Sequence, residues 1–223
     1  MSPIFLYIGG EAAPVISVIW LCDPTPDLIY ELSVSDFSVI RSAGSPGFAP
    51  QGIGGASDVI WHCDTTFNGK IRELSVIDLS EIRNANSPAV NPRGIGGASD
   101  VIWHCDITGI LGTIYELSTV DFSVVRSAAS DDDVPFGIGG ASDVIWHCDV
   151  VPDLIYELST VDFSVVRSAA SPSDAPQGIG GASDVIWHCD GFSDLIYELS
   201  VSDFSVIRSA SSPDNFPTGI GGS

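Results

Sequence analysis

Short runs of apolar residues alternate along the chain with polar, glycine-rich or proline-rich segments. In residues 52–93 the densest run is Val59–Cys63, and weaker runs follow at 71–75 and 80–85. None of these runs has the three- to four-residue spacing and the capping residues of an amphipathic helix. The pattern therefore predicts short β-strands joined by turns, and an all-β chain.

The same pattern occurs five times. Its most regular marker is a tryptophan, which recurs every 41 to 43 residues: Trp20, Trp61, Trp103, Trp146 and Trp187. The repeats cover about residues 9–51, 52–93, 94–136, 137–177 and 178–218, and one extra Gly-Ile-Gly-Gly follows at 219–222. A fixed period of this length is typical of modular repeat folds. Four short strands per repeat predict one four-stranded antiparallel blade each, so we expect residues 1–223 to form a single five-bladed β-propeller.

The motifs of a repeat follow one another in a fixed order. Gly-Ile-Gly-Gly is followed by Ala-Ser-Asp, by a tryptophan strand ending in Asp, by Ile-Tyr-Glu-Leu, and by a strand with Arg-Ser. This order resembles the NHL and YVTN-type propeller repeats, with WD-repeat-like blades, over almost the whole chain from Ile8 to Gly222. The resemblance implies that the Gly-Ile segment is the innermost strand, A, and that strands B, C and D follow toward the rim. It implies no particular activity, because this superfamily includes enzymes, scaffolds and lectins.

Two segments are candidates for closing the ring. Both Tyr7–Gly10 and Gly219–Gly222 resemble strand A, whereas strands B, C and D occur five times each. The C-terminal copy is closer to the consensus, so we expect it to complete the first blade beside residues 17–22, 28–33 and 38–43. Such a seam removes exposed strand edges. The alternative, that the chain is a piece of a longer repeat array, stays open.

Tryptophan and cysteine side chains are predicted to lie in the interior. Each tryptophan belongs to strand B, which is covered on both faces, so we expect it to pack between adjacent sheets rather than to stack on a ligand. The cysteines occupy one equivalent position per repeat: Cys22, Cys63, Cys105, Cys148 and Cys189. Equivalent positions in packed sheets are about 10 Å or more apart, whereas a disulfide requires Cα atoms within about 7 Å. Unpaired thiols, and an N-terminus without lysine or arginine, favour a cytoplasmic location.

Charge restricts the classes of partner. The chain has 8 Lys and Arg against 29 Asp and Glu, and its formal net charge is −21. Such a surface repels nucleic acid and anionic membranes. No apolar run approaches the roughly 18 residues of a membrane-spanning helix. We therefore expect a monomer with no nucleic-acid or membrane partner, whose ligand is a protein or a glycan.

One side of the predicted ring carries both variable loops and polar side chains. In an up-and-down blade the B–C and D–A connections emerge on the same side, and these connections differ between repeats. The candidate binding residues at this side are the histidine after the tryptophan and the aspartate after the cysteine: His62, His104, His147, His188, Asp64, Asp106, Asp149 and Asp190. Neutral variation of exposed loops is the alternative. Neighbouring strand residues point to opposite faces and zinc-motif spacing is absent, so we expect no metal site and no cofactor.

Further polar residues are expected to be structural. In each repeat a Glu on strand C faces an Arg on strand D, as with Glu31 and Arg41, which predicts a cross-strand ion pair. An aspartate in each C–D connection, such as Asp36, is expected to stabilise a turn.

The near-identity of the repeats favours a non-enzymatic binding or interaction module, because an enzyme normally breaks symmetry to build a single site. One alternative is a multivalent lectin-like propeller, which requires exposed aromatic residues in equivalent crevices between blades. A third, less favoured reading is a metal-dependent lactonase-like hydrolase. It requires a polar cluster at the axial mouth, where strand A offers only glycine and isoleucine.

Overall fold

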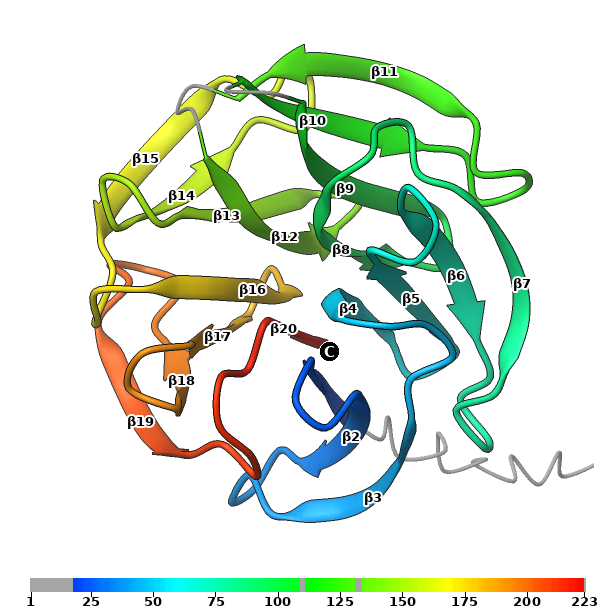
Figure 1. The fold of residues 1–223 in the computed structure, drawn as a ribbon. Coiled ribbons are helices and arrows are strands. Elements are labelled where there is room, and N and C mark those ends of the chain that lie inside the picture. Colours follow the sequence, from blue (N-terminus) through cyan, green and yellow to red (C-terminus); the bar gives the residue numbers. More distant parts are fainter. Residues whose placement is uncertain (1–17, 109–110, 131–133, 223) are drawn as a thin grey trace, which may run out of the picture.

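The computed structural model describes residues 18–108, 111–130 and 134–222. These residues form five four-stranded antiparallel sheets around a central axis, and no helix (Figure 1). The prediction of an all-β, five-bladed propeller is therefore confirmed. Blade 1 contains β20, β1, β2 and β3, and blades 2 to 5 contain β4–β7, β8–β11, β12–β15 and β16–β19.

Each blade runs from an inner strand A to an outer strand D. The A strands are β20 (Gly219–Gly222), β4 (Pro50–Ala56), β8 (Pro92–Ala98), β12 (Pro135–Ala141) and β16 (Pro176–Ala182). The B strands are β1 (Val18–Asp23), β5 (Val59–Asp64), β9 (Val101–Thr108), β13 (Val144–Asp149) and β17 (Val185–Asp190). The C strands are β2 (Leu28–Ser33), β6 (Lys70–Leu74), β10 (Leu111–Leu117), β14 (Leu154–Leu158) and β18 (Leu195–Leu199). The D strands are β3 (Val39–Gly44), β7 (Glu81–Asn86), β11 (Val124–Ala129), β15 (Val165–Ala170) and β19 (Val206–Ser211).

The C-terminal strand closes the ring, as predicted. β20 pairs antiparallel with β1, and Gly222 lies opposite Ile19 while Gly219 lies opposite Cys22. The hydroxyl of Thr218, just before β20, donates to the carbonyl of Pro50 in blade 2 at 2.9 Å. The first blade is therefore built from both ends of the described chain. The other candidate, Tyr7–Gly10, lies outside the described residues.

Glycines at the axis let the five A strands approach one another. A Cβ built on Gly139 would lie 2.8 Å from the Cα of Gly180, which is closer than non-bonded carbons approach. The same relation, at 2.8–2.9 Å, links each blade to the next around the whole ring: Gly54 to Gly96, Gly96 to Gly139, Gly139 to Gly180, Gly180 to Gly221, and Gly221 back to Gly54. The following glycine, such as Gly140 with φ of 130°, turns the chain into strand B. The A-strand glycines are thus required by close packing, as expected from the sequence.

The core lies between the blades. In blade 2, Trp61 and Cys63 pack against Ile95, Ile102 and Phe122 of blade 3. The Trp61 indole meets the Phe122 ring edge-on at 6.0 Å between centroids. All five tryptophans and all five cysteines are buried, and the cysteines are free thiols. Both expectations for these residues are confirmed.

Strand-D arginines connect each blade to the next. Glu157 and Arg167 lie opposite each other, and the Arg167 Nε donates to Glu157 Oε2 at 2.6 Å, which confirms the predicted cross-strand pair. The same guanidinium also donates to the backbone carbonyls of Val201 and Ser202 in the C–D turn of blade 5. It lies 4.5 Å above the centroid of the Phe204 ring. Equivalent bonds to the next turn are made by all five strand-D arginines, Arg41, Arg83, Arg126, Arg167 and Arg208. The sequence did not reveal this bridging role.

The predicted boundaries of strands B, C and D were accurate to about one residue. Strands C and D of blade 2 begin and end one residue from the expected 71–75 and 80–85, and strand A is longer than its Gly-Ile-Gly-Gly core. The turn aspartates act as expected: Asp162 accepts hydrogen bonds from the backbone N–H and the hydroxyl of Ser164. These bonds, with the hydroxyl of Ser159, lower the pKa of Asp162.

Candidate functional site

The B–C and D–A loops emerge at the same end of every blade, which confirms the expected arrangement. In blade 2 the first residue of strand A, Pro50, lies opposite the last residue of strand B, Asp64. In blade 1 the last residue of strand D, Gly44, lies opposite the first residue of strand C, Leu28. The loops that follow strands B and D therefore share one end of the ring. We call this end the loop face.

A buried polar cluster lies beneath the loop face in each histidine-containing blade. In blade 3, the Nδ1 of His104 donates to the carbonyl of Gly94 at 2.8 Å, and Nε2 lies 3.0 Å from the hydroxyl oxygen of Ser87. Ser87 donates to Asp106 at 2.8 Å, and the other carboxylate oxygen accepts from the Asn91 N–H. Because Ser87 and Asn91 belong to the preceding D–A loop, the cluster fixes that loop to the blade that follows it.

The eight predicted binding residues lie inside this layer. Each histidine donates through Nδ1 to a strand-A carbonyl: His62 to Gly52, His104 to Gly94, His147 to Gly137 and His188 to Gly178. The four histidines and their four aspartates are all buried, with at most 2% of each residue exposed. A ligand on the loop face therefore meets the loops before it meets these side chains. Their direct role in binding stays a prediction.

The cluster brings Ser, His and Asp together without the geometry of a nucleophilic triad. In such a triad the carboxylate bonds to Nδ1 and the serine to Nε2 of the same histidine. In blade 3 both Ser87 and Asp106 lie on the Nε2 side of His104, with 3.7 Å between His104 Nε2 and Asp106 Oδ2, and Nδ1 is bonded to the Gly94 carbonyl. Sequence spacing alone could not show this convergence, because the serine comes from the preceding repeat.

Burial favours the neutral forms of His62, His188 and Cys22. It lowers the pKa of His188 to about 4, against the smaller upward effects of the Gly178 carbonyl and the Asp190 charge. It lowers the pKa of His62 to about 4 as well. The His62 Nε2–Asp64 Oδ2 separation of 4.0 Å is therefore not an ion pair at neutral pH. Burial raises the pKa of the Cys22 thiol to about 12, so this cysteine is a packing residue and not a nucleophile.

Blade 2 departs from the others through a buried ion network. Arg72 replaces a tyrosine, and its guanidinium donates to Asp64 at 2.5 Å and also to Glu81, which replaces a valine. Burial acts to lower the pKa of Arg72, but the bonds and charges of Asp64 and Glu81 outweigh it and raise the pKa. The two substitutions thus compensate each other. Their occurrence in the same repeat was the sequence signal that could have revealed the pair.

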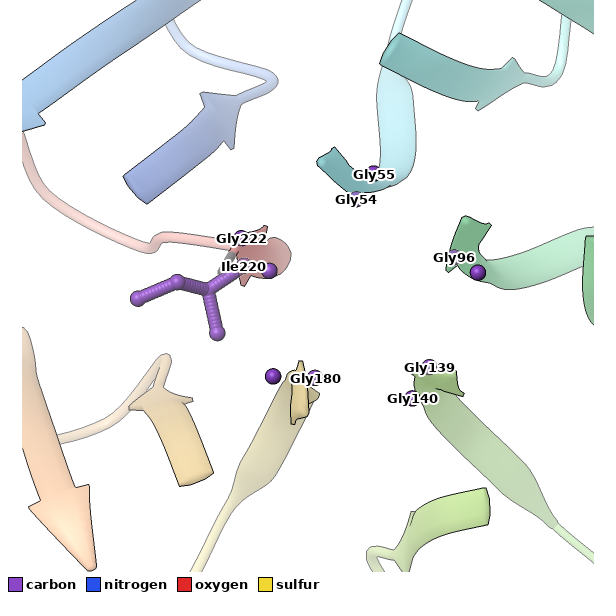
Figure 2. A pocket seen from close by; sticks show the side chains of 11 residues that line it. Gly54, Gly55, Gly96, Gly139, Gly140, Gly180, Ile220 and Gly222 are labelled. Carbon is purple, nitrogen blue, oxygen red and sulfur yellow. The ribbon is translucent and has the colours of Figure 1, made fainter. Parts of the chain in front are cut away.

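At the axis the ring exposes mainly glycine backbone and no titratable side chain among the lining residues. A small pocket is lined by the A-strand glycines, and Ile220 is its one larger side chain, as Figure 2 shows. The described residues contain no group of three or more His, Cys, Asp or Glu placed to hold a metal ion. They also contain no helix of the length and hydrophobicity that a membrane crossing requires.

Within the part of the chain that the structure describes, exposed aromatic side chains occur only on the loop face. Among the described residues, the exposed aromatics are Phe48, Phe67, Phe192 and Phe216. They belong to the loops around blade 1, and sequence reasoning did not single them out. The available signal was their position in variable loops, where Val90 stands in place of Phe48 and Val151 in place of Phe192.

Comparison with known proteins identifies the architecture. No model of a protein family matches the sequence, and no curated protein matches it. Solved structures do: the nidogen/laminin complex has a chain with 14% identity and a TM-score of 0.61, covering 94% of this chain and 86% of that one. The glutaminyl cyclase of Myxococcus xanthus has 13% identity and a TM-score of 0.57, covering 77% and 69%. The WD40 β-propeller domain of Doa1 has 10% identity and a TM-score of 0.54, covering 78% and 57%. At these identities the likeness concerns the fold alone, and the chain is a β-propeller with five blades.

Proposed function

We propose that this protein is a non-enzymatic binding module that uses its loop face to bind a partner protein. The observation that carries the proposal is the contrast between a nearly invariant scaffold and one differentiated face. Strands A to D repeat with the same register in all five blades, whereas the loops differ in length and carry the exposed aromatic side chains. Variable loops on a rigid scaffold are where recognition is commonly found.

The state of the buried polar groups supports a binding role over catalysis. The histidine Nδ1 atoms are bonded to strand-A carbonyls, and the cysteine thiols are buried with raised pKa values. These groups stabilise the base of the loop face and are not presented to solvent. The glutaminyl cyclase found by structural comparison shares the fold at 13% identity, which carries no activity over to this chain.

The burial of aromatic residues also weighs against equivalent glycan sites between blades. A lectin-like propeller needs exposed aromatic platforms repeated in each crevice, but all five tryptophans are at most 3% exposed. Tyr30, Tyr156 and Tyr197 are buried too. The exposed phenylalanines occupy one sector of the ring and therefore do not supply a fivefold set.

Site-specific photo-crosslinking tests the proposal. A benzophenone amino acid would be placed at Thr65 or Pro26 on the loop face, and at Asp78 or Asp162 on the opposite face as matched controls, since all four positions are exposed. In extract of the source cell we expect discrete crosslinked products from the loop-face positions only. Equal crosslinking from both faces, or products from the control positions alone, would contradict the proposal.

A further inference from the structure

Four exposed phenylalanines mark one sector of the loop face. Phe48 and Phe67 lie at the junction of blades 1 and 2, and Phe192 and Phe216 lie at the junction of blades 5 and 1. Their exposed fractions are 73%, 85%, 80% and 48%, respectively. We call these four residues the phenylalanine face. Solvent-exposed aromatic side chains gathered on one surface are typical of a binding site.

Within each pair, the two loops adjoin. The backbone N–H of Phe48 donates to the hydroxyl of Thr66, next to Phe67, at 2.8 Å. At the other junction, a Cβ built on Gly191 would lie 3.3 Å from the ring of Phe216, so the loop that carries Phe192 packs against that ring. The hydroxyl of Thr218 donates to the carbonyl of Pro50, which joins the ends of the two D–A loops. The two pairs therefore flank blade 1 on the loop face, and the buried Thr218–Pro50 bond ties together the D–A loops that carry Phe48 and Phe216.

The loops of this surface are fixed in unusual conformations. Phe216 has φ of 69° and Ala49, at the equivalent position, has φ of 50°, whereas the equivalent residues Asn91 and Ala175 are not in this left-handed region. Asp194 accepts from the Phe216 N–H at 2.6 Å, and Asp27 accepts from the Ala49 N–H at 2.9 Å. These bonds hold the aromatic loops in place before a ligand arrives, which lowers the entropy cost of binding.

The same surface is acidic. The loops 23–27, 45–50, 65–69, 191–194 and 212–218 contain no lysine or arginine. They supply three partly exposed aspartates, Asp27, Asp194 and Asp214, whereas Asp23 is completely buried. Burial raises the pKa of Asp23 to about 6, and the charges of Asp214 and Asp194 raise it further against the bond from the Thr25 N–H. The nearest cation in sequence, Lys70, is bonded to Asn86. Apolar rings beside carboxylates fit a ligand that is both cationic and apolar.

We propose that the phenylalanine face binds a peptide segment of a partner protein in which lysine or arginine residues alternate with apolar side chains. This inference rests on the proposed function and specifies its sector and its partner class. Apolar side chains of the peptide pack on the phenylalanines, and its cations meet Asp27, Asp194 and Asp214. Cation–π contacts with the exposed rings add to the attraction.

The net charge also argues against two other possible ligands of this surface, a second copy of the chain and an anionic membrane. A second copy of this chain carries the same net charge of −21, so two phenylalanine faces repel each other. An anionic membrane is repelled in the same way. A cationic peptide is attracted, and this attraction weakens as salt screens it.

The test is a selection from a random twelve-residue peptide display library against the whole protein. The affinities of the enriched peptides would then be measured by calorimetry for three variants that remain folded by thermal unfolding. F48S/F192S removes two rings, and V90S/V151S makes the matched change at the equivalent loop positions of other blades. D27N/D194N removes two charges and keeps the oxygen that caps each loop.

We expect enriched peptides with net positive charge and apolar residues. The affinity of these peptides should fall about tenfold or more in F48S/F192S, and less than about twofold in V90S/V151S. D27N/D194N should lower the affinity for these peptides at low salt, and the affinity should then change less as the salt concentration rises. The inference would be overturned by enriched peptides of neutral or negative charge. It would also be overturned if the selection enriched no more peptides than a control selection without the protein.

The remaining outcomes separate this inference from the proposed function. Peptides weakened by V90S/V151S but not by F48S/F192S would keep loop-face binding and refute the phenylalanine face. Peptides indifferent to every loop variant would refute both. Phenylalanine-dependent binding to phosphatidylcholine/phosphatidylglycerol vesicles, or phenylalanine-dependent self-association in sedimentation, would replace the peptide with a membrane or with a second copy.

Discussion

Replacing one axial glycine by alanine should destabilise the whole ring. In Gly139→Ala the new methyl group would stand 2.8 Å from the Cα of Gly180 and 3.0 Å from the carbonyl oxygen of Ile179. Carbon atoms pack at about 3.5–4.0 Å, so the strands must separate by roughly 0.7–1.2 Å. The contact is one of five in a closed ring, and the neighbouring atoms are backbone, so no side chain can rotate away.

The net effect is the difference between two terms. Overpacking of a tight interior costs about 1–3 kcal/mol. Alanine also restricts the unfolded chain, which by itself stabilises by about 0.4–1 kcal/mol. The midpoints of these ranges, about 2 and about 0.7 kcal/mol, leave an expected loss of about 1.3 kcal/mol in the free energy of unfolding for Gly139→Ala. Gly140→Ala should cost more, because its Cβ would lie 2.2 Å from the Val144 carbonyl oxygen and its φ is 130°.

Urea unfolding followed by the fluorescence of the buried tryptophans measures this difference. A loss of this size shifts the midpoint by about 0.5–1 M, and far-UV circular dichroism checks that both probes report one transition. Gly44→Ala is the control, because nothing lies within 4 Å of its added methyl group, and it should be neutral or slightly stabilising. If Gly139→Ala and Gly44→Ala unfold at the same urea concentration, the close-packing account of the A strands is wrong.

Three further outcomes follow from the site. First, the paired reversion Arg72→Tyr/Glu81→Val should be at least as stable as the parent, because buried ion pairs are commonly no better than apolar contacts. The losses of unfolding free energy in the two single variants should together exceed that of the double variant by about 1–3 kcal/mol. Additive values in this double-mutant cycle would refute the coupling. Second, the pKa of His188 near 4 lies below its unfolded value of 6.5, so its contribution to stability is complete above pH 6.5 and is lost as the pH falls toward 4. The variant His188→Leu copies Leu21 of blade 1. Between pH 7 and pH 4.5 its free energy of unfolding should fall by about 2 kcal/mol less than that of the parent. An unchanged pH profile would count against a buried neutral imidazole. Third, the five thiols should react with Ellman's reagent at pH 8 only after denaturation, because they are buried and the pKa of Cys22 is raised to about 12; fast reaction of the native protein would contradict the assigned burial.

Much of the architecture could be predicted from the sequence, because the relevant physics is local and repeated. The apolar run Val59–Cys63 predicts a strand that is covered on both faces, and it is completely buried. The extra Gly-Ile-Gly-Gly at 219–222 predicts the closing strand. The position of Glu31 relative to Arg41 predicts their pairing across one hairpin. The strand and the ion pair depend on neighbours within one repeat, whereas the closing strand follows from counting the copies of strand A against those of strands B, C and D.

The candidate site depended on contacts between blades, which lie outside any one repeat. The sequence placed His104 and Asp106 at the correct end of the molecule. Only the structure showed that Ser87 of the preceding loop covers them, because the contact forms when two blades pack. The bridging role of Arg167 was hidden for the same reason.

The sequence by itself determined the strand order and the interior, since burial and hairpin pairing follow from hydrophobic pattern and spacing. It favoured the C-terminal segment as the closing strand, and the structure showed that pairing. Tertiary structure decided which variable residues share a surface. Phe48 and Phe216 are 168 positions apart in the chain, and they flank the same blade because ring closure brings the last loop beside the first.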